Sequence, residues 1–84
     1  MNDETTFVDA SGLKCPLPVL KARKALEGLA PGDKLRVIST DAASPLDFKH
    51  FCNSKGHSLL SIEEKQDSFE FVLVKAGEQK GSKL

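Results

Sequence analysis

Residues 12–21 read GLKCPLPVLK, and in this stretch a cysteine stands between a lysine and a proline, with a second proline two residues further on. Proline is favoured in the first turn of a helix, because the N–H groups of that turn have no partner within the helix. Pro16 and Pro18 therefore predict the start of a helix with a stiff entry, and Cys15 falls at the position of its N-cap. The apolar residues that follow recur at helical spacing, which extends the predicted helix from Pro16 to Leu29.

The segments around this helix predict four strands and one further helix. Strands are expected at 5–8, 35–39, 58–62 and 69–74, and the polar turn between the last two makes them an antiparallel hairpin. The second helix should begin with Ser44 as N-cap and Pro45 in the first position, and should end at Gly56 in the left-handed conformation. The order is βαβαββ, an α+β fold in which two helices on one face of a small sheet make a two-layer α/β sandwich.

The length and composition are those of one ordinary globular domain. A chain of 84 residues can bury one modest core and is too short for two. Its apolar share of 39% and charged share of 29% are typical of globular proteins. We expect a single domain over residues 1–84, with a core from about residue 5 to residue 75 and polar, flexible ends.

The charge balance and the lack of long apolar runs exclude several classes of partner. Lys+Arg and Asp+Glu are 12 each, and the only aromatic residues are five phenylalanines, so direct binding of nucleic acid is not expected. No apolar run is long enough to span a membrane. The acidic, polar start lacks the pattern of a secretory signal. Two cysteines make no disulfide framework, so we expect a cytoplasmic protein.

Cys15 is the candidate reactive residue. A thiolate at the start of a helix would lie at the positive end of the helix dipole. No acidic residue occurs within 10–26, whereas Lys14, Lys21 and Lys24 are basic. Because helix ends and nearby cations lower the pKa of a cysteine, we expect an exposed Cys15 with a modestly lowered pKa. The same lysines would steer acidic partner surfaces towards it.

Other uses of cysteine and histidine find no support in the spacing. Cys52 lies beside Phe48 and Phe51 on the apolar stripe of the second helix, which predicts a core residue. A CxxC redox pair is excluded because Pro18 occupies the place of the second cysteine. No spacing pairs a histidine with Cys15 as a base, and the sequence contains no zinc or nucleotide motif. No metal or cofactor is expected. A single exposed thiolate can still accept a partner's sulfur, hold it and pass it on.

The stretch VDASGLKCPLPVLKARKAL resembles the signature of the TusA/SirA-like sulfur-carrier family, in which the cysteine of a CPxP motif opens the first helix. The matching positions are Asp9, Gly12, Leu13, Cys15, Pro16 and Pro18. The resemblance continues through STDAASPLDFKHFCNSKGHSLLSIEE, which includes Asp41 and His57, and covers roughly residues 6–75.

The resemblance implies a four-stranded mixed sheet with two helices on one face, and a sulfurtransferase that works as a carrier. Cys15 would hold sulfane sulfur as a persulfide, in a site shaped by Gly12, Pro16 and Pro18. The partners would be a protein sulfur donor, either a cysteine desulfurase or a rhodanese-like protein, and a DsrE-like or similar protein acceptor. The associated pathways are 2-thiouridine formation in tRNA, molybdenum-cofactor synthesis and sulfur oxidation.

Two other functions remain open from the residues alone. The same fold could be a non-catalytic interaction or regulatory module in which Cys15 does not react. Alternatively, Cys15 could be a redox-sensing cysteine that ends as a sulfenate or a mixed disulfide. The roles of Asp9, Asp41 and His57 also stay open.

Overall fold

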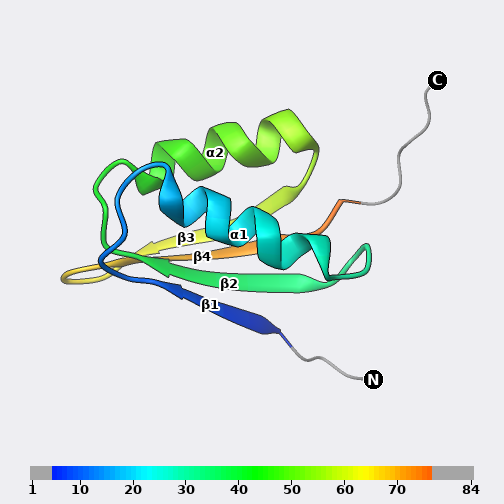
Figure 1. The fold of residues 1–84 in the computed structure, drawn as a ribbon, viewed down its shortest axis with the longest axis horizontal. Coiled ribbons are helices and arrows are strands. Elements are labelled where there is room, and N and C mark those ends of the chain that lie inside the picture. The colour runs from blue at the N-terminus through cyan, green and yellow to red at the C-terminus, as the bar shows by residue number, and fades with distance from the viewer. Residues whose placement is uncertain (1–4, 77–84) are drawn as a thin grey trace.

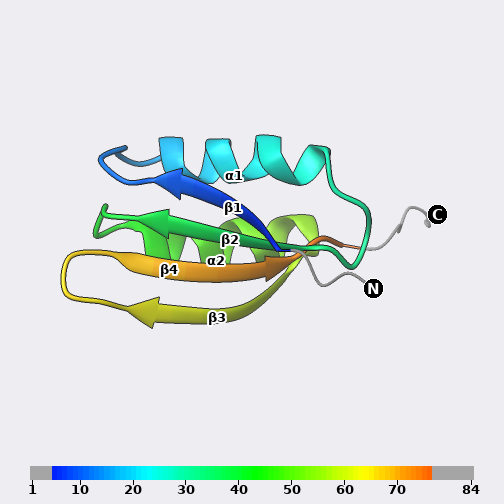
Figure 2. The same cartoon turned by 90° about the horizontal axis from the view of Figure 1, so that it is seen from below.

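The computed structural model describes residues 5–76, and these residues form the predicted two-layer fold. The elements are β1 (Thr6–Ala10), α1 (Leu17–Glu27), β2 (Lys34–Ser39), α2 (Ser44–Lys55), β3 (Ser58–Glu64) and β4 (Phe69–Val74). Both helices cover the same face of the sheet, as Figures 1 and 2 show from two directions. The ends that were expected to be flexible, residues 1–4 and 77–84, lie outside the described residues.

The sheet is mixed, as expected, with the strand order β1-β2-β4-β3. β1 pairs in parallel with β2, which places Ala10 opposite Ser39 at the ends of the two strands. β4 pairs antiparallel with both β2 and β3. Because the carboxyl ends of parallel neighbours meet at one edge of a sheet, the loops that follow β1 and β2 lie close together.

The core lies between the sheet and the helices. Along β2 the side chains of Leu35 and Val37 are fully buried, alternating with exposed neighbours as a half-covered strand requires. Phe48 of α2 stacks on Phe71 of β4 with ring centroids 4.4 Å apart, and both rings are fully buried. Stacked aromatic pairs of this kind add stabilisation beyond the area they bury.

The first helix buries one face against the sheet. Pro18, Ala22 and Leu26 are buried, and Val19 and Leu29 are partly buried against the core. After the helix ends, the ammonium of Lys75 donates to the carbonyl oxygens of Leu26 and Leu29, at 2.7 and 2.8 Å. A cation at this position satisfies free carbonyls and complements the helix dipole. None of the helices within residues 5–76 has the length and hydrophobicity to cross a bilayer.

The start of the second helix differs from the prediction. Ala43, not Ser44, is its N-cap, and no side chain caps it. Ser44 is already helical and buried, and its hydroxyl lies 2.5 Å from the hydroxyl of Ser39 at the end of β2. The hydroxyl therefore joins α2 to the sheet instead of capping the helix. Gly56 ends the helix with φ of 79°, which confirms the predicted left-handed stop.

Candidate functional site

The loop that carries Cys15 begins with a tight turn after β1. The Leu13 amide donates to the Ala10 carbonyl at 3.2 Å. The backbone angle φ is 81° at Gly12 and is not positive at Ser11. This is a type II turn, whose third residue needs the freedom of glycine. The Gly12 amide also donates to the Thr40 hydroxyl at 2.8 Å, which ties this loop to the one that follows β2.

A second tie holds Cys15 itself. Its backbone amide donates to Oδ2 of Asp41 at 2.8 Å. Asp41 is fixed in turn, because its amide donates to the Ser39 hydroxyl at 3.3 Å and its carbonyl accepts the Ser44 amide at 3.0 Å. The loop after β2 therefore anchors the reactive loop through side chains as well as through the sheet.

The entry to α1 confirms part of the prediction and corrects the rest. Cys15 is exposed, as expected, but it stands one residue before the N-cap, which is Pro16. The Pro16 carbonyl accepts the Leu20 amide at 3.1 Å, and Pro18 is buried in the first turn. The peptide bond between Cys15 and Pro16 is cis. The start of the helix has no side-chain cap hydrogen bond, so the Cys15 side chain does not cap it.

Two carboxylates lie close to the thiol. Sγ of Cys15 and carboxylate oxygens of Asp41 and Asp47 all lie within 4.8 Å of one another. A hydrogen bond to Asp47 raises the pKa of the Cys15 thiol, with further contributions from partial burial and from the negative charges of Asp47 and Asp41. The predicted lowering of this pKa is therefore wrong, because two anions, brought in by the second half of the chain, outweigh the lysines nearby in sequence.

The lysines are placed otherwise than expected. Lys21 donates to the backbone carbonyl of Asp9 at 2.9 Å, and so joins α1 to the end of β1. Lys14 and Lys24 are exposed. None of the three is among the charges that shift the pKa of Cys15. Among the described residues, these lysines therefore do not stabilise the thiolate of Cys15. Their contact with partner proteins stays a prediction.

Asp9 supports the loop and not the thiol. Its Oδ1 accepts the Ser11 amide at 3.0 Å. The hydrogen bonds from Ser11 lower the pKa of the Asp9 carboxyl, and the charge of Lys21 adds to the effect. Asp9 therefore stays ionised and helps to hold the turn that precedes Cys15.

The sequence did not single out Asp47, which lies in the first turn of α2. In the sequence it stands three residues after Ser44, where an acidic residue is typical of a helix start. Two parallel neighbouring strands should bring their following loops to one edge, and that topology could have indicated an encounter between Cys15 and this region. Cys15, Asp41 and Asp47 offer three atoms of metal-ligand type, but clustered acidic groups are common without an ion, and we assign no metal to them.

Beside Cys15 the surface is open and partly apolar. A depression of about 340 Å³ is lined by Pro16, Val19, Asp47, His50, Phe51 and Ser54. Leu17 is 48% exposed and Leu46 is 60% exposed, and these residues are near neighbours in sequence of Cys15 and Asp47. A flat, partly apolar surface around a reactive residue suits contact with a protein better than enclosure of a small molecule.

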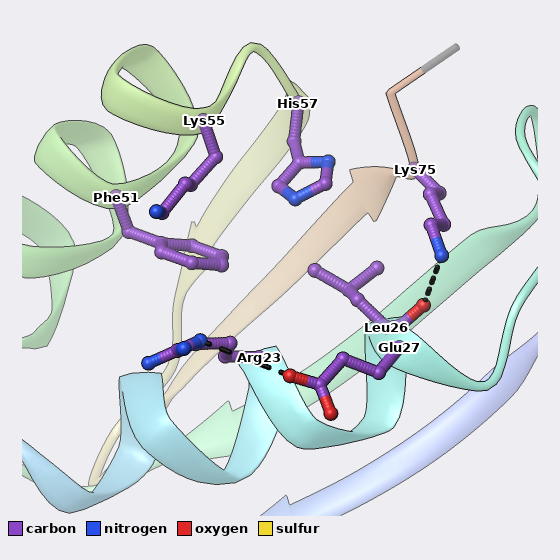
Figure 3. A pocket seen from close by; sticks show the side chains of 7 residues that line it. All are labelled: Arg23, Leu26, Glu27, Phe51, Lys55, His57 and Lys75. Atoms are coloured by element: carbon purple, nitrogen blue, oxygen red, sulfur yellow. Dashed lines mark hydrogen bonds and ion pairs between the residues drawn. The ribbon is translucent and has the colours of Figure 1, made fainter. Parts of the chain in front are cut away.

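A second cavity, of about 190 Å³, lies at the other end of the two helices and includes no residue of the Cys15 loop. Figure 3 shows its lining residues, which come from the C-terminal halves of α1 and α2 and from His57 and Lys75. Lys75 is engaged with the carbonyls that end α1, and Arg23 lies 3.9 Å from Glu27. These charges therefore serve local structure.

His57 is a structural residue of this cavity and supplies a pH-dependent contribution to stability. Its Nδ1 accepts the Ala76 amide at 2.8 Å, which requires an unprotonated Nδ1. Burial and the charges of Lys75 and Lys55 lower the pKa of His57 below its ordinary 6.5. The folded state therefore binds fewer protons than the unfolded state as the pH falls from about 7 towards 5.5, and the unfolding free energy should decrease over that range.

This decrease can be measured by urea unfolding at several pH values. His57→Gln should reduce the slope of stability against pH in that window. His50→Gln is the matched control, because His50 is exposed on α2, and it should keep the slope of the unmodified protein. An unchanged slope in His57→Gln would show that another group titrates.

The chain is similar along most of its length to proteins of one family. Residues 6–75 match the family model of sulfurtransferase TusA. A protein of Neisseria meningitidis, named only provisionally as a sulfur carrier, is 48% identical over 73 residues, which cover 87% of this chain and 96% of that protein. The sulfur carrier protein TusA of Allochromatium vinosum is 41% identical over 76 residues, covering 90% of this chain and 100% of that protein. A solved SirA-like protein of Desulfitobacterium hafniense superposes with a TM-score of 0.75 at 26% identity, covering 88% of this chain and 100% of that one.

Proposed function

The chain belongs to the sulfurtransferase TusA family of sulfur carriers, and from this membership we propose that Cys15 is the residue that carries the sulfur, as a persulfide. The observation that supports this most strongly is an exposed thiol on a loop at the edge of the sheet. Two hydrogen bonds fix this loop, from the backbone amides of Gly12 and Cys15 to the side chains of Thr40 and Asp41. A fixed, exposed sulfur can meet the sulfur of another protein in line, without a rearrangement of the carrier.

The proposed reaction consists of two exchanges between sulfur atoms. Cys15 loses its proton to solvent, and the thiolate attacks the terminal sulfur of a donor persulfide. A bond forms between Cys15 Sγ and that sulfur, the donor's S–S bond breaks, and the donor leaves as a thiolate with the bonding electron pair. An acceptor thiolate then attacks the terminal sulfur on Cys15 in the same way. The electrons balance at each exchange, so no oxidant and no cofactor is needed.

The residues around Cys15 would shape this site. Gly12 allows the turn that presents the loop, and Pro16 and Pro18 stiffen the start of α1. The exposed Lys14 and Lys24 would steer acidic surfaces of partner proteins, while Lys21 would act mainly through its bond to Asp9.

The proposed partners are proteins: a cysteine desulfurase or rhodanese-like donor and a DsrE-like or similar acceptor. The open, partly apolar surface beside Cys15 supports protein contact. The pathway would be thiolation of tRNA, molybdenum-cofactor synthesis or sulfur oxidation, in the cytoplasm. The equal numbers of basic and acidic residues favour no direct contact with nucleic acid or membrane.

The decisive experiment is sulfur loading by a donor. The protein is incubated with a cysteine desulfurase and cysteine, and its intact mass is then measured. We expect a gain of one sulfur atom that a reducing agent removes and that maps to Cys15. No gain in mass under conditions that load another carrier would contradict the proposal.

The raised pKa bears on the two alternative functions. Redox-sensing cysteines are exposed and have a low pKa, whereas the carboxylates beside Cys15 raise the pKa of its thiol, so the structure favours the redox alternative less than the sequence does. In both a non-catalytic module and a carrier, the free Cys15 thiol would react slowly with alkylating reagents. Loading by the donor separates these two, whereas the alkylation rate of the free protein does not.

A further inference from the structure

We propose that Asp47 is a positioning residue that holds the sulfur of Cys15 as a hydrogen-bonded thiol between transfers. This inference rests on the proposed function of Cys15, because it concerns the same sulfur atom. It goes beyond that function by giving a role in controlling the carrier to a residue of the second helix, which none of the sequence motifs indicated.

The position of Asp47 suits this role. Its backbone amide donates to the Ala43 carbonyl at 3.1 Å, which fixes it in the first turn of α2. A negative charge in that turn is favourable at the positive end of the helix dipole. Its side chain is half-buried, and its carboxylate lies within 4.8 Å of both Cys15 Sγ and the carboxylate of Asp41.

Asp47 differs from Asp41 in what else it binds. Oδ2 of Asp41 accepts the backbone amide of Cys15 and therefore fixes the loop. Within residues 5–76, no lysine, arginine or histidine forms an ion pair with Asp47. The carboxylate of Asp47 is thus available to accept a hydrogen bond from the Cys15 thiol.

The remaining charges near Cys15 do not offset the two carboxylates. Asp47 and the exposed His50 face this region from α2, and Asp41 faces it from the loop after β2. Lys14 precedes Cys15 in the chain but is exposed, and Lys21 is engaged with the Asp9 carbonyl. Ionisation of the thiol would therefore place a third negative charge beside Asp41 and Asp47. The thiol consequently ionises only at higher pH.

This arrangement has a consequence for the carrier. The thiolate is the nucleophile and the form that alkylating and oxidising reagents attack. A thiol held by Asp47 reacts slowly with such reagents while the carrier is free, so fewer carriers are lost before they receive sulfur. The cost is a smaller fraction of thiolate for the transfer itself at neutral pH.

The test compares alkylation of free Cys15 by iodoacetamide across the pH range in the unmodified protein and in Asp47→Asn, with the modified residue identified by mass spectrometry. We expect the rate profile of Asp47→Asn to move to lower pH, and the rate at neutral pH to rise at least about threefold, because a larger fraction of Cys15 is then thiolate. Asp47→Glu keeps the charge and should stay close to the unmodified protein.

Asp67→Asn is the matched control, because Asp67 is an exposed acid in the turn between β3 and β4. It should leave the profile unchanged. An Asp47→Asn profile at the same or a higher pH than that of the unmodified protein would overturn the inference. Thermal unfolding of each variant establishes that it is folded.

A measurement on the unmodified protein serves if Asp47→Asn does not fold. Raising the salt concentration to about 1 M shortens the screening length to about 3 Å and weakens the effect of both carboxylates on the thiol. The alkylation profile should then move to lower pH, whereas a move to higher pH would show that cations control the thiol and would contradict the inference. These measurements use no sulfur donor, so their failure and a failure of sulfur loading are separate results.

Discussion

Cys15→Ser is expected to gain no sulfur from a cysteine desulfurase, whereas the unmodified protein gains one atom. Serine keeps the size and exposure of the side chain, but its oxygen cannot form the S–S bond that stores the sulfur. A serine hydroxyl also does not ionise in the range where a thiol does, so it supplies no competing nucleophile at neutral pH. Loss of loading should therefore be complete within the sensitivity of intact-mass measurement.

The second cysteine provides the control for this substitution. Cys52 is 3% exposed, and burial raises its pKa to about 11, so it holds neither an accessible nor an ionised sulfur. Cys52→Ala should therefore load as the unmodified protein does. Equal loading of Cys15→Ser and the unmodified protein would remove Cys15 from the mechanism, and the sulfur would then have to be sought on another residue.

Phe48→Ala is expected to cause the largest loss of stability. The ring is fully buried between α2 and the sheet and stacks on Phe71 at 4.4 Å. Truncation of a buried phenylalanine costs about 3–5 kcal/mol, because the transfer free energy is lost and a cavity remains. A small domain has a total stability of roughly 5–15 kcal/mol, so this one change could leave a large unfolded fraction.

Urea unfolding measures this effect, with Phe7→Ala as the matched control. Phe7 lies on β1 and is 55% exposed, so its truncation should lower the unfolding free energy by no more than about 1 kcal/mol. A loss of less than about 1 kcal/mol in Phe48→Ala would mean that the contact between α2 and β4 contributes little to the fold. The loss of loading in such a variant should follow its unfolded fraction and not a chemical defect.

The elements of the fold could be predicted because each has a local signal. Pro16 and Pro18 start the first helix, Gly56 ends the second, and alternation marks the strands. The prediction for Ser44 failed because a tertiary partner competed with the local pattern. The hydroxyl that would cap a free helix binds Ser39 at the end of β2 instead.

The chemistry around Cys15 could be predicted only in part. Its exposure follows from its place between lysine and proline at the boundary of an element. The sign of its pKa shift depends on residues far away in the chain, because Asp47 and Asp41, which is 26 residues distant, raise the pKa of the thiol and no lysine contributes to the shift. Nearness in sequence was thus a poor guide to which charges act on the thiol.

Because two hydrogen bonds join the Cys15 loop to Thr40 and Asp41, the motif would not keep its structure outside this fold. A synthetic peptide of the first helix and its approach, or a graft of these residues onto another scaffold, would contain every letter of the signature. It would lack the groups that fix the loop and set the acidity of its sulfur. Engineering a minimal version of this site therefore requires both halves of the chain.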